Sequence, residues 1–472
     1  MRANPSPNEP AMSAIAFLCH PTVGHVNGLL SIARQMGAEG HSPRFLIPGA
    51  PPLPFRLRPD VLNNVVDVPL IVERAGVPVT RLKPALGVVM HALVLPWTSG
   101  YTEMRRAQAL FTSGMVGTTR HILRSLEQQP VDALVVDFFF HPGLFAAEKL
   151  GLPFVSLYHS GLPFRGPQVP PFGSGLPIGD RGPAWEPAEA EERALVGGLR
   201  AKLDAARRAL GLPPGAEDPV RTPVSPWLNL IPSHERIEAP RDGLGRNTAF
   251  IGPCTSTRRG AASEPFPFEK LEEGTFKVYV SLGTVFNSRP DVFLKLIEGL
   301  DQPGVQVVVS AGASQPTLAS KVKSERVLLF RRVPQLELLP RMDLVVGHGG
   351  NNSTNETLAA GKPLLVVPVG GEQHDNARRV EYLGVGLSLG FKTMTVEDVR
   401  RAVARLRTEP HFAEKARELK GHLDRTDGTR TAAALIAHLA KRKAPVLLPE
   451  GAPRTLHPDD VAPVLAANGG AA

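Results

Sequence analysis

The stretch VVGHGGNNSTNETLAAGKP, residues 345–363, places small polar side chains directly after an apolar run that is typical of a buried strand. Two glycines follow His348 and allow a ligand to approach the backbone closely. A helix that begins here would offer free N–H groups and a positive dipole end, which favour an anion. The pattern therefore predicts a phosphate or diphosphate site around His348 to Ser353. Ser353 and Glu356 also have the S-x-x-E spacing of a capping box, which stabilises a helix start without any ligand.

Alternating strands and helices would position this site. The first half of the chain contains a segment with helical spacing, 26–40, among apolar strand-like runs at 14–20, 42–49, 133–139 and 153–159. A second series of such runs follows residue 274, at 277–283, 305–311, 326–334, 342–350 and 362–369. This alternation predicts parallel sheets covered by helices on both faces, with ligands at the carboxyl ends of the strands.

Breaks in the alternation suggest how the chain is divided. The segment 252–274 is polar, contains Gly, Ser and Pro, and lacks periodicity, which predicts a linker between domains. A second segment, 161–187, is rich in Pro and Gly and predicts a long surface loop. We therefore expect one domain at 1–251, the linker at 252–274, a second domain at 275–444 and a partly disordered tail at 445–472.

Composition bounds the class of protein. A chain of 472 residues with 42% hydrophobic and 21% charged residues is typical of a globular protein with two or three domains. The formal net charge of +8 is modest, and no Lys/Arg-rich run with interleaved aromatic residues predicts nucleic-acid binding. The chain has two distant cysteines, no signal-peptide pattern and no apolar run of about 18 residues. These features predict a cytoplasmic protein without stable membrane insertion.

Several short motifs follow one another in a fixed order between residues 332 and 377. They are V-P-Q, then H-x-G-x-x-S-x-x-E, then a proline, then an acidic residue followed by glutamine. This set resembles the donor-binding signature of the UDP-glucuronosyl and UDP-glucosyl transferase family, and in particular its bacterial macrolide glycosyltransferases. The resemblance extends to GHVNGLLSIARQMGAEGH (24–41), ALVVDFF (133–139) and VYVSLGT (278–284), and covers most of the chain from residue 13 to residue 440.

The resemblance implies an α/β protein of the GT-B fold, with two Rossmann-like, doubly wound domains that face each other across a cleft. It implies that the N-terminal domain, 1–251, binds the acceptor and that the C-terminal domain, 275–444, binds the nucleotide sugar. It implies an inverting transfer of a hexose from a UDP- or dTDP-sugar, with UDP-glucose as the first expectation, to a hydroxyl group of an apolar natural-product acceptor. The nucleotide sugar would be a co-substrate, so no cofactor is expected. Neither the residues nor the resemblance predict an oligomeric state.

Roles in donor binding are implied by position in the family's motifs. Gln335 and the backbone near Val333 would contact the base, and Glu356 would accept hydrogen bonds from both ribose hydroxyls. Other positions match the diphosphate contacts, and the pair at 372 and 373 matches the contacts to the sugar hydroxyls. The full expected set is Thr284, Arg332, Val333, Gln335, His348, Gly350, Asn352, Ser353, Glu356, Glu372 and Gln373. Arg332 stands where plant members carry the Trp that stacks on uracil, which leaves uracil and thymine both open.

The reaction needs a base for the acceptor hydroxyl and charge stabilisation for the leaving diphosphate. His25 occupies the family's G-H-x-N position, in an expected loop after the first strand. A nearby helix N-terminus would disfavour imidazolium and keep the ring able to accept a proton. Asp137, at the end of a later strand, would hold the other ring nitrogen. His20, five positions before His25, competes as the base.

The acceptor and the metal requirement are less closely specified. Aromatic residues expected near the acceptor are Trp97, Tyr101, Phe138, Phe164 and Phe172. No D-x-D motif or His/Cys cluster predicts a metal site, so the helix start and His348 would neutralise the diphosphate. Two alternatives remain open: a GT-B nucleotide-sugar epimerase, which forms product without an acceptor, and a non-catalytic partner of another glycosyltransferase.

Overall fold

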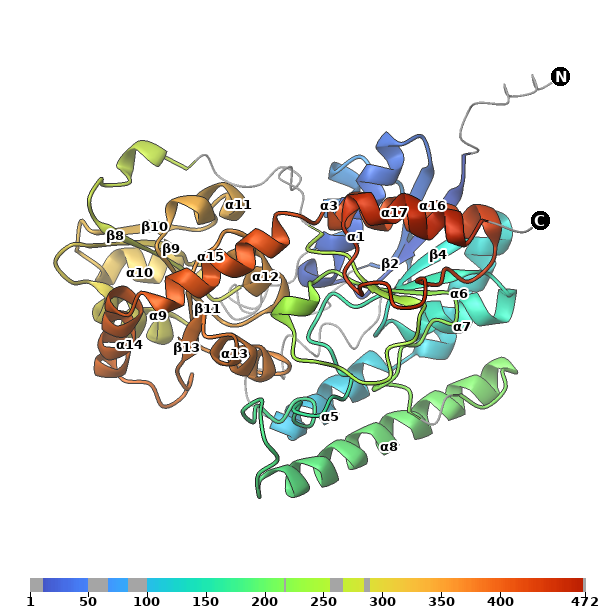
Figure 1. The fold of residues 1–472 in the computed structure, drawn as a ribbon, viewed down its shortest axis with the longest axis horizontal. Helices are drawn as coiled ribbons and strands as arrows, with labels where there is room; N and C mark the ends of the chain where they lie inside the picture. Colours follow the sequence, from blue (N-terminus) through green and yellow to red (C-terminus); the bar gives the residue numbers. More distant parts are fainter. Residues whose placement is uncertain are drawn as a thin grey trace.

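Two parallel sheets, each covered by helices, make up the protein (Figure 1). The computed structural model describes residues 12–49, 67–83, 100–215, 218–254, 266–283 and 289–469. The predicted α/β fold with two doubly wound, Rossmann-like domains is confirmed. Within the described ranges, no helix combines the length and the apolar character that crossing a bilayer would require.

The first sheet has the strand order β3-β2-β1-β4-β5-β6-β7, and all its pairings are parallel. The central strands β1 and β4 lie side by side and are almost wholly buried, as expected for apolar runs covered on both faces. The strand order reverses between them, so the ends of β1 and β4 border the position where such sheets bind ligands. The bounds are β1 (Ala14–Leu18), β2 (Ser42–Pro48), β3 (Val79–Leu82), β4 (Ala133–Asp137), β5 (Phe154–Leu157), β6 (Leu228–Ile231) and β7 (Thr248–Phe250).

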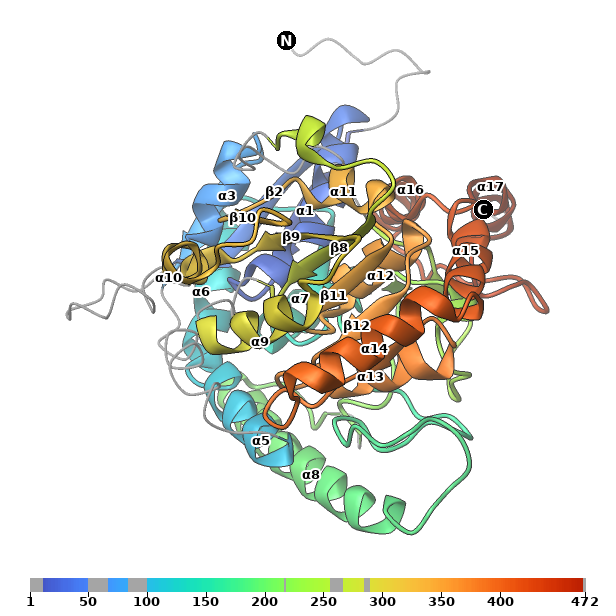
Figure 2. The ribbon, with the colours of Figure 1, turned by 90° about the vertical axis from the view of Figure 1, so that its left-hand side faces the viewer.

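The second sheet repeats this topology in the order β10-β9-β8-β11-β12-β13, again with parallel pairings (Figure 2). Its order reverses between β8 and β11, so the segment after β11 is the equivalent ligand-binding position. The bounds are β8 (Phe276–Ser281), β9 (Val305–Ser310), β10 (Val327–Phe330), β11 (Leu344–Gly347), β12 (Leu364–Val366) and β13 (Gly386–Ser388).

Helices connect the strands and cover both sheets (Figures 1 and 2). Those that follow the strands of the first sheet are α1 (Val23–Ala38), α3 (Val68–Arg74), α5 (Gly100–Phe111), α6 (Met115–Gln128), α7 (His141–Leu150) and α8 (Trp185–Leu210). Those of the second half are α9 (Pro290–Leu300), α10 (Gln315–Lys321), α11 (Gln335–Leu338), α12 (Asn351–Ala359), α13 (Gln373–Tyr382), α14 (Val396–Thr408), α15 (His411–Leu423), α16 (Gly428–Arg442) and α17 (Pro458–Ala467). Short 3₁₀ turns lie at Glu235–Ile237, Phe268–Lys270, Gly312–Ser314 and Leu339–Arg341.

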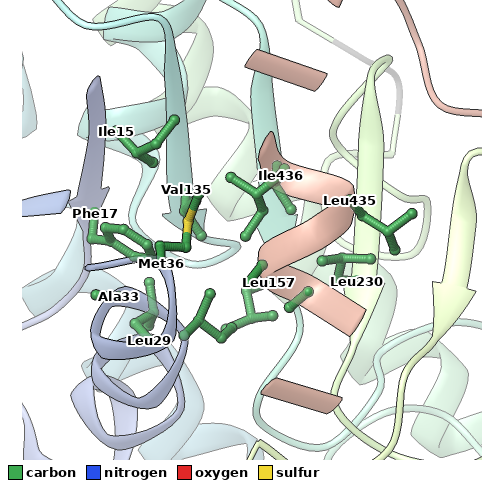
Figure 3. Close-up of a cluster of buried hydrophobic side chains, with 14 of the residues drawn as sticks. Ile15, Phe17, Leu29, Ala33, Met36, Val135, Leu157, Leu230, Leu435 and Ile436 are labelled. Carbon is green, nitrogen blue, oxygen red and sulfur yellow. The ribbon is translucent and has the colours of Figure 1, made fainter. Parts of the chain in front are cut away.

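Helix α16 returns to the first sheet, which differs from the predicted C-terminal domain of 275–444. Its apolar face packs against α1 and the strands of the first sheet. Leu435 and Ile436 lie beside Leu157 and Leu230 in the same buried cluster (Figure 3). The sequence prediction missed this return because a helical repeat shows which face is buried, but not which sheet covers it.

The segment 445–472, predicted as a partly disordered tail, is ordered over its described residues. Leu448, Leu456 and Val464 are buried in the cluster that also contains α16. The backbone of Phe250 on β7 donates to Arg454 and accepts from Leu456, both at 2.8 Å, so the tail extends the edge of the first sheet. The tail is therefore part of the core of the N-terminal domain.

Two adjacent leucines test this packing. Leu448 is 5% exposed and Leu447 is 38% exposed. Leu448→Ala should lower the free energy of unfolding by about 2–5 kcal/mol, because a buried leucine loses its contacts and leaves a cavity. The control Leu447→Ala should change this free energy by less than about 0.5 kcal/mol. Urea denaturation followed by circular dichroism measures both, and equal effects would contradict the inclusion of the tail in the core.

Candidate active site

A buried carboxylate lies at the carboxyl end of β4. Asp137 is fully buried, and its Oδ2 lies 2.6 Å from Nδ1 of His25. The backbone N–H of Phe139 donates to the other oxygen, Oδ1, at 3.1 Å. His25 stands in the first turn of α1 rather than in the expected loop, and its side chain is 23% exposed. The hydrogen bond leaves the second nitrogen of His25, Nε2, as the one available to a substrate.

The charge on Asp137 controls the basicity of His25. Burial raises the pKa of the Asp137 carboxyl, but His25 and His159 outweigh burial and hold that pKa well below its usual range. Burial lowers the pKa of His25, but the charge and the hydrogen bond of Asp137 raise it above its usual 6.5. The carboxylate therefore has a larger effect on the pKa of His25 than the helix N-terminus, which was expected to lower this pKa and keep the ring neutral. The result is a stronger base in contact with solvent.

His20, the competing candidate, lies in a different environment. It is 4% exposed, and its ring packs on Phe111 and Phe140. Nε2 of His20 forms a hydrogen bond of 3.2 Å with the backbone oxygen of Phe139. Burial lowers the pKa of His20 to about 4, which makes it a weak base. The geometry thus favours His25.

His159 is a site residue that the sequence reasoning missed. It follows β5, the strand next to β4, and its ring lies 4.4 Å from that of His25 between centroids. Its Nε2 lies 3.2 Å from Oδ1 of Asp137, but off the direction of a hydrogen bond. The signal was available, because His159 ends the predicted strand 153–159 and adjacent parallel strands end at the same edge of a sheet.

The polar segment after β11 forms the start of α12. Gly350 is the N-cap residue, and the helix begins at Asn351 without a side-chain cap. The capping-box interpretation of Ser353 and Glu356 is therefore wrong, because Ser353 lies inside the helix. His348 precedes the helix, and burial lowers its pKa to about 4. The free N–H groups of α12 suit a phosphate group, and Nδ1 of His348, just before the helix, has no hydrogen-bond partner.

The backbone of Gly283 lies close to the ring of His348 at this edge of the second sheet. Gly283, after β8, has a φ of 76°, which favours glycine. A Cβ atom there would lie 2.6 Å from Cε1 of His348. The absence of a side chain at Gly283 therefore allows the His348 ring to sit between the ends of β8 and β11. Thr284, the next expected diphosphate contact, lies outside the described residues.

Glu356 is held by a chain of hydrogen bonds inside the second domain. Nε2 of Gln335 donates to Oε2 of Glu356 at 2.6 Å, and the hydroxyl of Tyr279 donates to Oε1 of Gln335 at 3.1 Å. Glu356 is 4% exposed. Gln335, expected to contact the base, thus orients the carboxylate expected to bind ribose.

The remaining expected donor residues lie on two loops. Arg332 is exposed after β10, and Val333 is buried in a hydrophobic cluster. Glu372 is the N-cap residue of α13. Oε1 of Gln373 accepts hydrogen bonds from the backbone of Val369 and Gly370, at 2.9 and 3.3 Å, so a contact with a sugar hydroxyl, as expected from the sequence, would use its amide NH₂.

Asparagine side chains join the two halves of the site. Nδ2 of Asn352 donates to the backbone oxygen of Gly24, next to His25, at 2.7 Å. Nδ2 of Asn351 donates to the backbone oxygen of His159 at 3.0 Å. Arg379 on α13 pairs with Glu238 of the first domain, and also donates to the side-chain oxygen of Asn351 at 2.9 Å. The start of α12 is therefore placed against the His25–Asp137 pair.

The aromatic residues expected at the acceptor site have different surroundings. Phe138 and Phe164 both pack on Tyr158 within one buried cluster, and Trp97 lies outside the described residues. Tyr101, on α5, is partly buried. Phe164 and Phe172 line a cavity of about 250 Å³ together with Arg241, Glu192 and other residues of the 161–181 segment, α8 and α13.

The Pro- and Gly-rich segment differs from the expected surface loop because it packs between the domains. Backbone N–H groups of Gly173 and Gly175 donate to Asp375 on α13, at 2.6 and 2.9 Å. Leu162 and Phe164 are buried. The segment therefore forms a wall of the cavity that both domains share.

Known proteins resemble this chain in sequence and in fold. Residues 199–426 match the family model described as UDP-glucoronosyl and UDP-glucosyl transferase. The NDP-glycosyltransferase YjiC of Bacillus licheniformis is 34% identical over 422 residues, which cover 89% of this chain and 96% of that protein. The 4'-demethylrebeccamycin synthase of Lentzea aerocolonigenes is 29% identical over 435 residues, which cover 89% and 97%. The crystal structure of the glycotransferase of kitacinnamycin has a TM-score of 0.67 at 22% identity, over 92% of this chain and 100% of that one.

Glu356→Gln separates a ligand-binding role from a structural one. The variant should bind UDP-glucose about tenfold or more weakly, because a hydrogen bond to a charged group contributes about 1.5–3 kcal/mol. Its melting temperature should change little, because glutamine still accepts from Gln335 and no cap is lost. Calorimetry with UDP-glucose and its 2′-deoxyribose analogue on both proteins measures this. Unchanged affinity for the ribose donor in the variant would exclude Glu356 as its ligand.

Proposed function

The chain belongs to the UDP-glucoronosyl and UDP-glucosyl transferase family, and we propose that it transfers a hexose, with inversion, from a nucleotide diphosphate sugar to a hydroxyl group of an apolar natural product. The observation that carries the proposal is the 2.6 Å contact between His25 and Asp137, placed against the start of α12 by the bond from Asn352 to Gly24. A base and a diphosphate site then face each other from opposite domains.

In this mechanism His25 acts as the base. Asp137 accepts a hydrogen bond from Nδ1, which fixes the tautomer with a lone pair on Nε2. Nε2 removes the proton of the acceptor hydroxyl as its oxygen attacks the anomeric carbon. Asp137 then stabilises the imidazolium that forms. The raised pKa of His25 suits this step, because a base is most effective when its pKa is near the working pH.

The leaving nucleoside diphosphate would bind at the start of α12. Free backbone N–H groups there donate to the phosphate oxygens and stabilise the charge that develops as the bond to the sugar breaks. A bound phosphate would favour the protonated ring of His348, which then donates to it from Nδ1. The base acts from the first domain and the leaving group departs toward the second. Attack from the face opposite the leaving group follows from that arrangement, and such attack inverts the anomeric carbon.

Donor recognition would use the second domain throughout. Glu356, oriented by Gln335, accepts from the ribose hydroxyls, while Glu372 and the free amide of Gln373 contact the sugar hydroxyls. Arg332 is exposed beside α11 and would stack on the base. A guanidinium stacks on uracil and thymine alike, so UDP-glucose is our first donor and dTDP-glucose the second to test.

The acceptor would enter beside the 161–181 segment. The relatives named above include a rebeccamycin synthase and a glycotransferase of kitacinnamycin, which supports a natural product as the acceptor. The cavity of about 250 Å³ lies just below the range of about 300–1,000 Å³ that is common for small-molecule sites. A bulky acceptor would therefore require the contacts of Asp375 with Gly173 and Gly175 to open.

His25→Ala tests the assignment of the base. Transfer from UDP-glucose to a flavonoid or polyketide hydroxyl should fall by about 10²–10⁴-fold, the contribution of a positioned base. Binding of UDP should stay close to that of the wild type, because His25 is on the acceptor side. Rate measurements and calorimetry on the same preparations separate the two effects. Near-normal turnover in this variant would contradict the assignment of His25 and would make His20 the candidate base.

Chelation tests the role given to α12. If its N–H groups and His348 neutralise the diphosphate, exhaustive treatment with EDTA should leave the transfer rate within about twofold of its starting value, since no divalent ion is then needed for the charge. The same preparation with added Mg²⁺ is the control. A strict loss of activity that Mg²⁺ or Mn²⁺ restores would contradict this account.

A further inference from the structure

Three side chains around the base have the composition of a transition-metal site. Potential ligand atoms of His25, Asp137 and His159 all lie within 4.8 Å of one another. These residues come from three separate segments of the chain, so no short His/Cys motif in the sequence predicts the site. Two imidazoles and one carboxylate are a recurrent three-ligand set for zinc, with a fourth position left open.

The surroundings of His159 also favour a bound metal ion. Its ring is 3% exposed, and Nε2 has no hydrogen-bond partner. That nitrogen lies 3.2 Å from Oδ1 of Asp137. Zinc bonds of about 2.0–2.1 Å in a tetrahedral arrangement place ligand atoms roughly 3.3 Å apart, so this pair already has the required spacing. A bound ion would satisfy the unpartnered nitrogen.

His25 is the ligand that has to move. The 2.6 Å between its Nδ1 and Oδ2 of Asp137 is a hydrogen-bond distance, too short for two ligands of one ion. The His25 side chain is 23% exposed, whereas that of Asp137 is fully buried and that of His159 nearly so. A small displacement of the His25 ring toward solvent opens the space between the three groups.

We propose that Zn²⁺ binds to His25, Asp137 and His159 and thereby switches off transfer. A zinc ion on Nδ1 of His25 takes the place of the proton that Nδ1 now donates to Asp137. The single proton of the neutral ring then moves to Nε2, the nitrogen that has to accept the acceptor's proton. The ring becomes a donor where the reaction needs a base. Nitrogen ligands select Zn²⁺ over Mg²⁺ and Ca²⁺, which prefer oxygen.

Calorimetric titration with Zn²⁺ tests binding without any assumption about catalysis. Wild-type protein should bind one zinc ion, and His159→Gln should bind it about tenfold or more weakly, since changes around a metal site commonly cost 10–100-fold in affinity. His159→Asn serves as a second variant in case one of the two fails to fold. Co²⁺ should give the visible absorption of a tetrahedral site in the wild type but not in the variants.

A second group of histidines supplies the matched control. The rings of His422 and His457 lie 5.6 and 6.1 Å from that of His234, and none of these three histidines belongs to the cluster of His25, Asp137 and His159. His422→Gln should bind Zn²⁺ at the site of the base as tightly as the wild type. Zinc binding that is lost in His422→Gln and kept in His159→Gln would overturn the proposal, as would the absence of binding.

The inhibition rests on the proposed function and is measured separately. Saturating Zn²⁺ should lower transfer by about tenfold or more, the scale of losing a positioned base, and EDTA should restore it. Mg²⁺ at the same concentration should have no effect. If zinc binds at this site but transfer is unchanged, the proposed inhibition is wrong and the assignment of His25 as the base is contradicted as well. If zinc does not bind, only the zinc proposal is wrong, and the assignment of His25 is unaffected.

Discussion

The buried carboxylate of Asp137 constrains everything around it. A charge taken out of water is costly unless nearby groups pair with it and donate hydrogen bonds to it. Here His25, His159 and the backbone of Phe139 surround the two oxygens. Because these contacts hold the carboxylate in place, its hydrogen bond fixes the position and the tautomer of His25. The orientation of His25 therefore follows from the way the fold accommodates a buried charge.

Polar groups make many of the contacts between the domains, beside the buried side chain of Ile237. Amide side chains on α12 donate to backbone oxygens of the first domain, and the buried pair of Arg379 and Glu238 lies beside them. When the domains separate, these groups form hydrogen bonds with water instead. The free energy needed to break the polar contacts is therefore smaller than that needed to expose an apolar surface of the same size. This interface holds the start of α12 against the segment that carries His25.

Both halves of the site use the same feature of sheet topology. His25 follows β1 and Asp137 ends β4, where the order of the first sheet reverses, and His348 follows β11, where the order of the second reverses. Connections leave in opposite directions at these points and expose the strand ends. The return of α16 to the first sheet joins the two domains by a second crossing of the chain, close to the linker.

The sequence by itself determined the alternation of strands and helices, the two domains and the polar motif from His348 to Glu356, because such patterns depend on neighbours within a few residues. It also indicated His25 and Asp137, which stand at ends of predicted strands and helices. Only the tertiary structure decided that His159 joins them, that Gln335 orients Glu356, and that α16 belongs to the first domain. These outcomes depend on contacts between residues far apart in the chain, and a local pattern carries no information about which distant surface will cover it.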